Sequence, residues 1–249
     1  MKAAILNSID LGGRNVDYRL VRSKAGRKLR VRVGPAGVEV VQPEMREIED
    51  IEAFLLENSQ WIIGQLERTE RFRSIWKPQR SGAGEILYRG TPTPVHVEDI
   101  VQHRGANKIV FERGCLVIMR GRRSRTSPAK SLENWLRKQA REEIKRCLDA
   151  VTHKLKRYPC KVYVMSQRTK WGNCSSLQNL SFNWRLIMAP DFVMRYLVTH
   201  EAVHLAVPDH SQRFWLTVQS LCPEMERARQ WLCANSCQLF LDIHQSCLE

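Results

Sequence analysis

The sequence predicts an α+β fold in which a basic, β-rich front is followed by a compact, mostly helical back. Apolar and polar residues alternate over residues 16–42 and 84–120, as in strands, whereas residues 47–76 and 131–157 carry apolar residues at helical spacing. The net charge of +14 is also uneven: residues 161–249 hold 8 basic and 7 acidic side chains, so +13 falls on residues 1–160. We therefore expect a basic β-rich region with one long helix over residues 1–125 and a second region over residues 126–249, or one continuous domain.

The front is predicted to begin with strands and one helix. The segments VDYRLVRS, KLRVRV and VEVVQP alternate as hairpin strands do, and the turn between the last two falls at residues 34–37. A helix should then run from about Glu47 to Trp76. Four further strands are expected in GEILYRG, TPVHVE, NKIVFE and CLVIMRG.

The back is predicted to be mostly helical around two strands. A helix should span about Ser131 to Arg157, because Pro159 cannot continue it. A strand at KVYVMS, the loop QRTKWGNCSS, a strand at NLSFNWRLIM and three helical stretches complete the chain.

Composition places the chain among ordinary soluble proteins. With 249 residues, 43% hydrophobic and 27% charged, it can bury one large core or two modest ones. Its first residues are too polar for a signal-peptide core, and no window approaches the roughly 18 apolar residues of a membrane span. We expect a cytoplasmic protein that does not contact a membrane. Its eight cysteines are then expected to be reduced thiols, and a second zinc site on the four C-terminal cysteines is disfavoured by their spacing.

The basic front raises the possibility of a nucleic-acid partner. The densest cluster is RGRRSR at residues 120–125, and further Lys and Arg residues follow on the helix predicted after it. Such a cluster attracts polyanions, but base-stacking aromatic residues are scarce around it. A solvated basic face remains the alternative.

The segment YLVTHEAVHLAVPDHSQRFW, residues 196–215, carries the chemistry. A helix is expected from Pro190 to about Ala206, which places His200 and His204 one turn apart on one face. Glu201 lies about 100° round from His200, within reach of a water on a shared ion. This is the H-E-x-x-H arrangement, with two zinc ligands and a general base. The alternative is a pair of half-buried histidines that happen to flank a glutamate.

His210 is the candidate for a third ligand. It follows Pro208, and Asp209 with Gln212 resembles a capping pair that would place His210 in the first turn of the next helix. The positive end of a helix disfavours imidazolium and so keeps the ring neutral for a metal. Three histidines with an open fourth position describe a catalytic zinc site holding one Zn²⁺ per chain.

The run KWGNCSSLQNLSFNWRLIMAPDFVMRYLVTHEAVHLAVPDHSQRFW resembles the YgjP-like metallopeptidase family, whose pattern contains W-G-S-C-S, L-N-W-R-L, H-E-L-x-H and H-S-x-x-F-W. The front of the chain also looks like that family's basic β-rich part. Through its relationship to the SprT and Spartan zinc proteases, the resemblance implies a zincin-like catalytic half with an active-site helix under a small sheet. It also implies zinc on His200, His204 and His210, with Glu201 as base. Asn173 and Ala202 depart from the pattern, which puts substrate preference and helix packing in doubt.

Several residues are candidates for substrate binding. The loop that contains Trp171, Gly172, Asn173 and Cys174 could line the cleft, or it could be a buried turn. In the zincin arrangement that the resemblance implies, an edge strand pairs with the substrate backbone, and residues 179–188 are the candidate unless that strand is interior. Its polar side includes Asn183 and Arg185. Candidates for stabilising the oxyanion are Tyr196, Arg168 and Arg185.

The sequence thus predicts a zinc metallopeptidase acting on a protein or peptide substrate, with water activated by zinc and Glu201. A cysteine protease is less favoured, because no histidine lies near Cys174 in the sequence. The alternatives are a nucleic-acid-binding module with a structural or vestigial metal, and a protease recruited by nucleic acid through the basic front.

Overall fold

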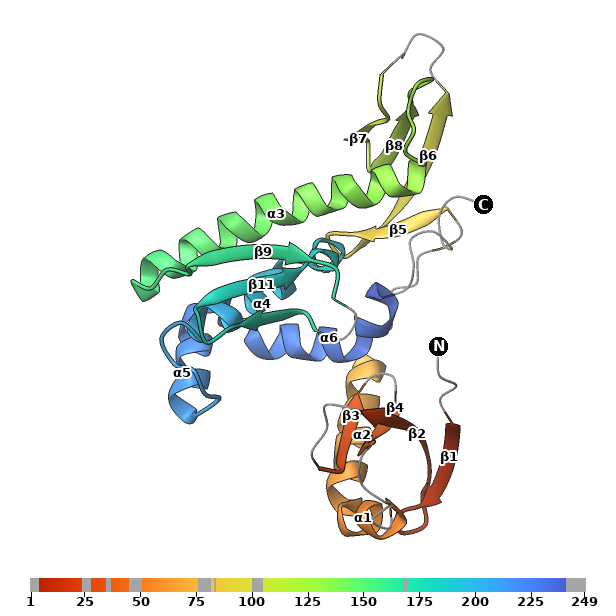
Figure 1. Ribbon diagram of the computed structural model, residues 1–249, viewed down its shortest axis with the longest axis vertical. Coiled ribbons are helices and arrows are strands. Elements are labelled where there is room, and N and C mark those ends of the chain that lie inside the picture. The colour runs from red at the N-terminus through yellow and green to blue at the C-terminus, as the bar shows by residue number, and fades with distance from the viewer. Residues whose placement is uncertain are drawn as a thin grey trace. The chain divides into compact units, whose positions relative to one another are not determined.

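The computed structural model describes residues 5–23, 28–34, 37–44, 51–75, 82, 84–99, 105–167 and 170–240. The fold is α+β, as predicted, with three small sheets among its described residues (Figure 1). Contacts divide the chain into two compact units. Unit 1 comprises Met1–Pro78 with Cys233–Cys237, and unit 2 comprises Gln79–Leu232 with Gln238–Glu249. The boundary between these units follows Pro78. The predicted division after residue 125 stays a prediction.

Unit 1 contains a four-stranded sheet in the order β1-β2-β4-β3. Its strands are β1 (Ile5–Asp10), β2 (Asn15–Ser23), β3 (Arg30–Gly34) and β4 (Gly37–Pro43). The β3–β4 hairpin confirms the predicted turn, of which Pro35 and Ala36 lie outside the described residues. β2 pairs with β4 in parallel, and β1 is a strand that the sequence did not predict.

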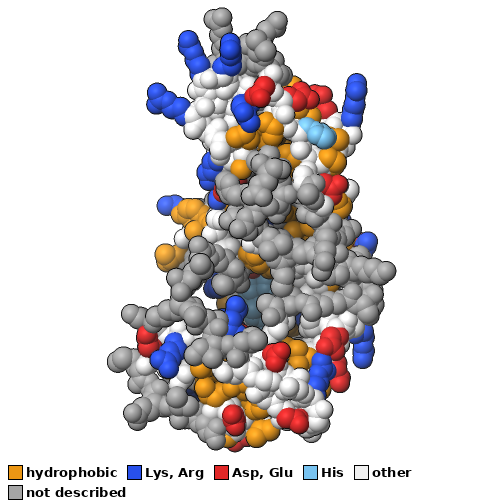
Figure 2. Space-filling model, turned by 90° about the vertical axis from the view of Figure 1, so that its right-hand side faces the viewer, with side chains coloured by type: hydrophobic (Ala, Val, Ile, Leu, Met, Phe, Trp, Pro, Cys, Tyr) orange, Lys and Arg blue, Asp and Glu red, His pale blue; other side chains and the backbone are white. Residues whose placement is uncertain are grey.

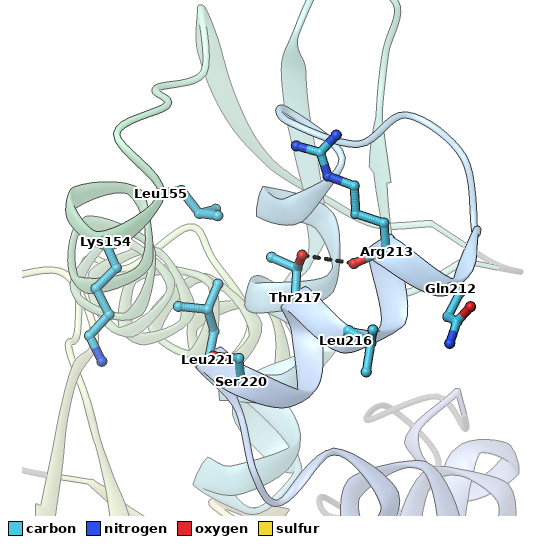
Figure 3. A pocket seen from close by; sticks show the side chains of 8 residues that line it. All are labelled: Lys154, Leu155, Gln212, Arg213, Leu216, Thr217, Ser220 and Leu221. Carbon is cyan, nitrogen blue, oxygen red and sulfur yellow. Dashed lines mark hydrogen bonds between the residues drawn. The ribbon is translucent and has the colours of Figure 1, made fainter.

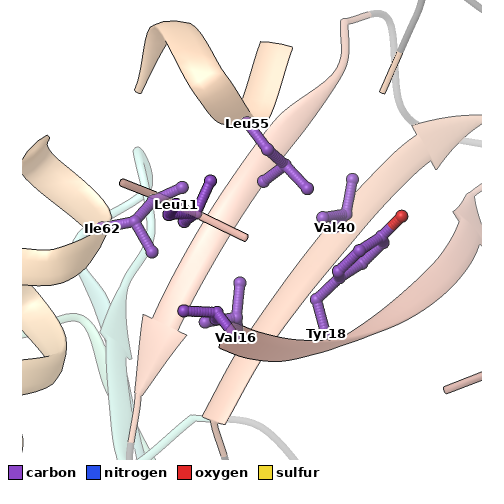
Figure 4. Close-up of a cluster of buried hydrophobic side chains, with 7 residues drawn as sticks. Leu11, Val16, Tyr18, Val40, Leu55 and Ile62 are labelled. Carbon is purple, nitrogen blue, oxygen red and sulfur yellow. The ribbon is translucent and has the colours of Figure 1, made fainter. Parts of the chain in front are cut away.

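Two helices pack on this sheet where one was predicted. α1 (Ile51–Glu57) and α2 (Ser59–Ile75) are separated at Asn58, whose side-chain amide donates to the Phe54 carbonyl at 2.8 Å. The Phe54 carbonyl also accepts from the Asn58 backbone amide at 3.3 Å, so the side chain shares this acceptor with the helical ladder at the point where the two helices meet. The start and the end of the predicted helix lie outside the described residues. The core of unit 1 lies between the helices and the sheet (Figure 4), and its buried members are Leu11, Val16, Tyr18, Val38, Val40, Leu55 and Ile62.

Unit 2 begins with a sheet in the order β5-β6-β8-β7, which confirms the four strands predicted over residues 84–120. The strands are β5 (Glu85–Tyr88), β6 (Thr91–Asp99), β7 (Lys108–Glu112) and β8 (Cys115–Arg120). The helix α3 (Pro128–Leu155) follows. Ser127 caps its N-terminus by accepting from the Lys130 amide at 3.3 Å, and Lys156 ends it in the left-handed region at φ 51°.

The second sheet of unit 2 has the order β10-β11-β9. β9 (Lys161–Met165) runs parallel to β11 (Asn179–Asn183), and β10 (Gly172–Cys174) runs antiparallel to β11 on its other side. The predicted strand over residues 179–188 is therefore half wrong. After Asn183 the chain turns into the 3₁₀ helix η1 (Trp184–Met188), because the Asn183 side-chain oxygen accepts from the Arg185 amide at 3.1 Å and caps it.

Three helices complete unit 2 and confirm the predicted helical end. α4 (Asp191–Val203) lies against β10 and β11 (Figure 1). It is followed by α5 (Gln212–Leu221) and α6 (Met225–Leu239), the last of which contributes residues to both units. No helix in the described part of the chain is long and apolar enough to cross a membrane.

Arg89, in the turn between β5 and β6, fixes the start of α4. Its guanidinium donates to both carboxylate oxygens of Asp191, at 3.0 and 2.7 Å, and to Glu143 on α3 at 3.0 Å. The next residue, Gly90, has φ 81°, and a Cβ there would lie 2.4 Å from Pro190. Arginine pairs with two carboxylates from different helices, and this contact holds the hairpin, α3 and the first turn of α4 in one arrangement.

Candidate metal centre

Helix α4 carries the first two histidines on one face. The helix begins after Pro190, with Asp191 in its first turn where the helix dipole favours a negative charge. His200 lies in its last turn and His204 at the C-cap, four residues on. The helix is buried on most of its sides, so its two imidazoles are held by packing before any metal is considered.

The chain brings His210 to the same point. Nitrogen atoms of His200, His204 and His210 all lie within 4.8 Å of one another. His210 Nε2 is 3.2 Å from His200 Nε2. The predicted cap is wrong in one detail: Ser211 is the N-cap of α5 and its amide donates to Asp209 at 3.2 Å, so His210 precedes the helix and lies in the loop.

Aromatic rings from α5 hold the imidazoles in place. The Phe214 ring stacks on His204 with centroids 4.4 Å apart and meets His200 edge-on at 4.9 Å. Trp215 contacts both His200 and His210. Because Phe214 is fully buried, this packing fixes the ring positions from the core side.

The electrostatics favour neutral imidazoles. Burial, reinforced by the neighbouring His204 and His210, lowers the pKa of His200 to about 4. Burial also lowers the pKa of His204, although its contact with the Val207 carbonyl opposes this shift. His204 Nδ1 lies 3.2 Å from that carbonyl oxygen, which makes Nδ1 the protonated nitrogen and leaves the lone pair on Nε2.

These donors fit a zinc ion. A zinc–nitrogen distance of about 2.0–2.1 Å in tetrahedral geometry places ligand nitrogens roughly 3.3 Å apart, close to the 3.2 Å between His200 and His210. Two Nε2 atoms at that distance need a proton or a cation between them, since two lone pairs repel. Three imidazole donors, with no fourth His, Cys, Asp or Glu in the group among the described residues, match a catalytic rather than a structural zinc site.

Glu201 lies beside this cluster and is itself buried, with 7% of its surface exposed. Burial raises the pKa of its carboxyl to about 7, and the charge of Lys170 and a hydrogen bond from the Cys174 backbone amide act in the opposite direction. Gly172 lies directly against it, because a Cβ at that position would come within 2.6 Å of Glu201 Cγ. The short strand β10 therefore sets the position of this carboxylate.

A cleft of about 430 Å³ opens over the cluster. One wall is formed by the histidines and Glu201, and the other by the segment that follows Lys170. The residues that line it are Lys170, Gly172, Asn173, Cys174, Ser175, Ser176, His200, Glu201, His204, Pro208 and His210. The predicted loop over residues 167–176 supplies Lys170, Gly172, Asn173, Cys174, Ser175 and Ser176 to this lining, of which Gly172, Asn173 and Cys174 were named as substrate candidates. Pro208 was not predicted to line the cleft.

Two predicted substrate residues have other roles. Asn183 is fully buried, and its amide donates to the carbonyls of Gln167 at 2.7 Å and Lys170 at 3.2 Å. Both of its protons are thus committed inside the protein, and it positions the segment leading into β10. Arg185 stacks on the Trp184 ring at 4.7 Å and donates to Ser166, so it does not line the cleft.

Tyr196 and Trp171 do not line the cleft. Tyr196 is buried one turn before His200 with ring centroids 5.9 Å apart, and burial raises the pKa of its hydroxyl to about 12. Trp171 packs on Phe240 at 4.5 Å and supports the start of β10. Arg168 lies outside the described residues.

Cys174 reaches the cleft as a thiol. Burial and the nearby Glu201 carboxylate raise its pKa, which is opposite to what a cysteine nucleophile needs. Of the C-terminal cysteines, Cys222 is buried and Cys233 donates to Thr69 Oγ1 at 3.7 Å. The Cys237 side chain and Cys247 lie outside the described residues.

A helix that carries His-Glu-x-x-His beneath a small sheet, in a mixed α+β fold, defines the chain as a zincin-like metallopeptidase domain. The family model described as YgjP-like, metallopeptidase domain, matches residues 27–235. Because the match covers most of the chain, this protein belongs to the YgjP-like metallopeptidase family. No curated protein and no solved structure matches the chain.

Proposed function

We propose that this chain is a zinc-dependent peptidase in which His200, His204 and His210 hold one metal ion and Glu201 is the general base. The observation that carries the proposal is the convergence of three imidazole nitrogens within 4.8 Å beside a buried carboxylate. Membership of a metallopeptidase family supports it. The substrate is a protein or peptide.

Glu201 transfers a proton in the proposed reaction. When bound, zinc supplies a Lewis acid that polarises the scissile carbonyl and makes water more acidic. Glu201 accepts a proton from the attacking water on a carboxylate oxygen while the new carbon–oxygen bond forms. It then gives that proton to the amine nitrogen as the carbon–nitrogen bond breaks. A carboxyl whose pKa is raised to about 7 can both accept and return a proton near neutral pH.

The free edge of β10 is the proposed binding surface for the substrate backbone. β11 lies between β9 and β10, so the strand predicted for this role is interior and has no free edge. Asn183 donates to the Trp171 carbonyl and Ser175 donates to the Asn179 carbonyl, so residues 171 and 175 bond towards β11. In an antiparallel ladder the alternate residues, Gly172 and Cys174, then direct their backbone groups away from β11. The Cys174 amide donates to Glu201, which leaves the Gly172 backbone groups and the Cys174 carbonyl for an extended peptide to pair with by strand addition.

Metal analysis of purified variants tests this proposal. Replacing any one of the three histidines with Ala should lower bound zinc well below one per chain, since two protein donors remain. Glu201→Gln should keep zinc near one per chain while cleavage of a peptide library, followed by mass spectrometry, falls by about 10² to 10⁴. Chelation should abolish cleavage and leave the far-UV circular dichroism of the fold intact.

His153→Ala is the matched control, because His153 is exposed on α3. It should leave both zinc and cleavage unchanged. Full zinc in the His210→Ala variant would show that the third ligand lies elsewhere. A Glu201→Gln variant that cleaves at the wild-type rate would remove the proposed base.

A second candidate function is recruitment by nucleic acid, favoured by the arginines after β8. Arg120 pairs with Asp99 at 3.4 Å, whereas Arg122, Arg123 and Arg125 are exposed with no acidic partner among the described residues. Figure 2 shows Lys and Arg side chains projecting from the upper part of the view, where β6, β7 and β8 lie in Figure 1. Such unpaired charges are available to phosphates.

A further inference from the structure

A second hollow lies on unit 2, between the C-terminal end of α3 and the outer side of α5. Its volume is about 700 Å³, within the range of ligand-binding pockets. Figure 3 shows Lys154 and Leu155 of α3 beside Leu221 of α5. Four polar or basic residues of α5, Gln212, Arg213, Thr217 and Ser220, and one further leucine, Leu216, complete the lining.

The floor of this groove is aliphatic. Leu155 and Leu221 are half-buried, and Leu216 is 58% exposed. Thr217 turns its hydroxyl back to the Arg213 carbonyl at 2.8 Å, so it offers little polarity to the groove. An exposed leucine beside two half-buried ones is an apolar surface without a partner among the described residues.

The rim of the groove is basic. Lys154 on α3 and Arg213 on α5 are exposed, and neither has an acidic partner in the described part of the chain. No lining residue is acidic. Lys156 and Arg157 extend the positive charge beyond the end of α3, and residues 153–165 contain no Asp or Glu. A partner that fits both features carries carboxylates around an aliphatic side chain.

The groove is also close to the metal centre along the chain. His210 lines the cleft, and Gln212, two residues later, lines the groove. Two residues span at most about 7 Å. The cleft and the groove thus have lining residues within about 7 Å of each other at this point of the chain.

We propose that this groove is an exosite that binds an acidic, leucine-containing segment of protein substrates. This inference rests on the proposed peptidase function for its purpose, although binding itself needs no catalysis. A segment that folds as an amphipathic helix suits a groove between two helices, with its leucine on the floor and its carboxylates towards Lys154 and Arg213. The absence of aromatic residues from the lining disfavours single-stranded nucleic acid, whose bases stack on aromatic rings.

Fluorescence anisotropy tests the exosite on the catalytically silenced Glu201→Gln protein. The probe is a labelled peptide in which one leucine is flanked on both sides by glutamates. Lys154→Glu combined with Arg213→Glu should weaken its binding by about tenfold or more, because two attractions become repulsions. Leu216→Ser should also weaken binding, and a peptide with Ala in place of its leucine should bind less well than the original.

The matched control is Lys138→Glu with Arg141→Glu, which removes the same charge from exposed positions on α3 away from the groove. Unchanged peptide binding in the control, with loss in the groove variant, supports the exosite. Equal loss of peptide binding in both variants, or no loss in the groove variant, overturns it. A single-stranded oligonucleotide that binds the groove in place of the peptide also overturns it. When the two groove substitutions are made in the protein that retains Glu201, cleavage of a short peptide without the acidic segment should equal that of wild type. If no peptide is cleaved at all, the peptidase function fails while the binding result stands.

Discussion

Gly172 and Glu201 are in such close contact that the site admits no side chain at residue 172. A Cβ atom there would lie 2.6 Å from Glu201 Cγ and 2.8 Å from its Oε1. Gly172 belongs to β10, whose backbone also donates to the Glu201 carboxylate through Cys174. The same three-residue strand thus limits where the carboxylate can lie and stabilises its charged form.

The first prediction concerns Gly172→Ala. The new methyl group must displace the Glu201 side chain, and a misplacement of about 1 Å can lower a rate by about 10². Zinc content should stay near one per chain, because no ligand moves directly. Peptide cleavage with parallel metal analysis measures both. Gly64→Ala, on α2 where a Cβ meets nothing within 4 Å, is the control and should leave cleavage unchanged. Wild-type cleavage by Gly172→Ala would show that this contact is dispensable.

The second prediction concerns the pH dependence of stability in the metal-free protein. Burial raises the folded-state pKa of Glu201 to about 7 from 4.5, so its contribution is fully present below 4.5 and is lost as pH rises through 7. Glu201→Gln removes this dependence. Relative to wild type, the free energy of unfolding of the variant should therefore rise by about 2 kcal/mol between pH 5 and pH 8. Each pKa unit corresponds to about 1.4 kcal/mol.

Urea denaturation of chelator-treated protein at the two pH values measures this difference. His200, whose lowered pKa makes stability rise with pH, is present in both proteins and cancels in the comparison. Glu142→Gln, at an exposed position on α3, is the control for replacing a hydrated carboxylate. A difference in the free energy of unfolding between Glu201→Gln and wild type that stays constant with pH would contradict this prediction. It would show that ionising the Glu201 carboxyl does not destabilise the fold.

The third prediction distinguishes a positioning role of Asn183 from substrate contact. Asn183→Asp keeps the size of the side chain but removes both donated protons, which places a carboxylate against the carbonyls of Gln167 and Lys170. Leaving such buried groups unsatisfied should lower the free energy of unfolding by about 1–3 kcal/mol. Urea denaturation checks this, and wild-type stability combined with reduced cleavage would favour the substrate role that the sequence suggested.

These residues show which parts of the site a sequence can reveal. His200, Glu201 and His204 are separated by fixed helical geometry, so their spacing alone predicts a shared face. β10 has only three residues and no alternation to detect, because its conformation comes from pairing with β11. Asn183 was placed on the polar side of a predicted strand, but its burial is set by carbonyls of a neighbouring loop. Tertiary contacts of this kind override local pattern.

The same limit applies to the fold. Pro190 and Pro208 bracket the helical segment in the sequence, and the described α4 lies between them. The 3₁₀ helix η1 was missed, since residues 184–188 are apolar enough to pass for a buried strand and only the Asn183 cap ends the strand. The junction of α1 and α2 at Asn58 was missed as well, and there too a side chain bonds to the backbone.

The last prediction concerns nucleic acid and the arginines after β8. If Arg122, Arg123 and Arg125 each contact a phosphate, affinity for a single-stranded oligonucleotide should fall steeply with salt, because counterions are released on binding. Each contact contributes about 0.7 to the slope of log affinity against log salt, so replacing all three with Ala should flatten the slope by about 2. Anisotropy titrations over a series of NaCl concentrations measure it. The control replaces Arg22, Lys28 and Arg30 of unit 1 with Ala, which removes the same charge from other exposed positions. If the salt slope is unchanged in the first variant, or falls equally in both, these three arginines are a solvated face and make no specific contact with phosphates.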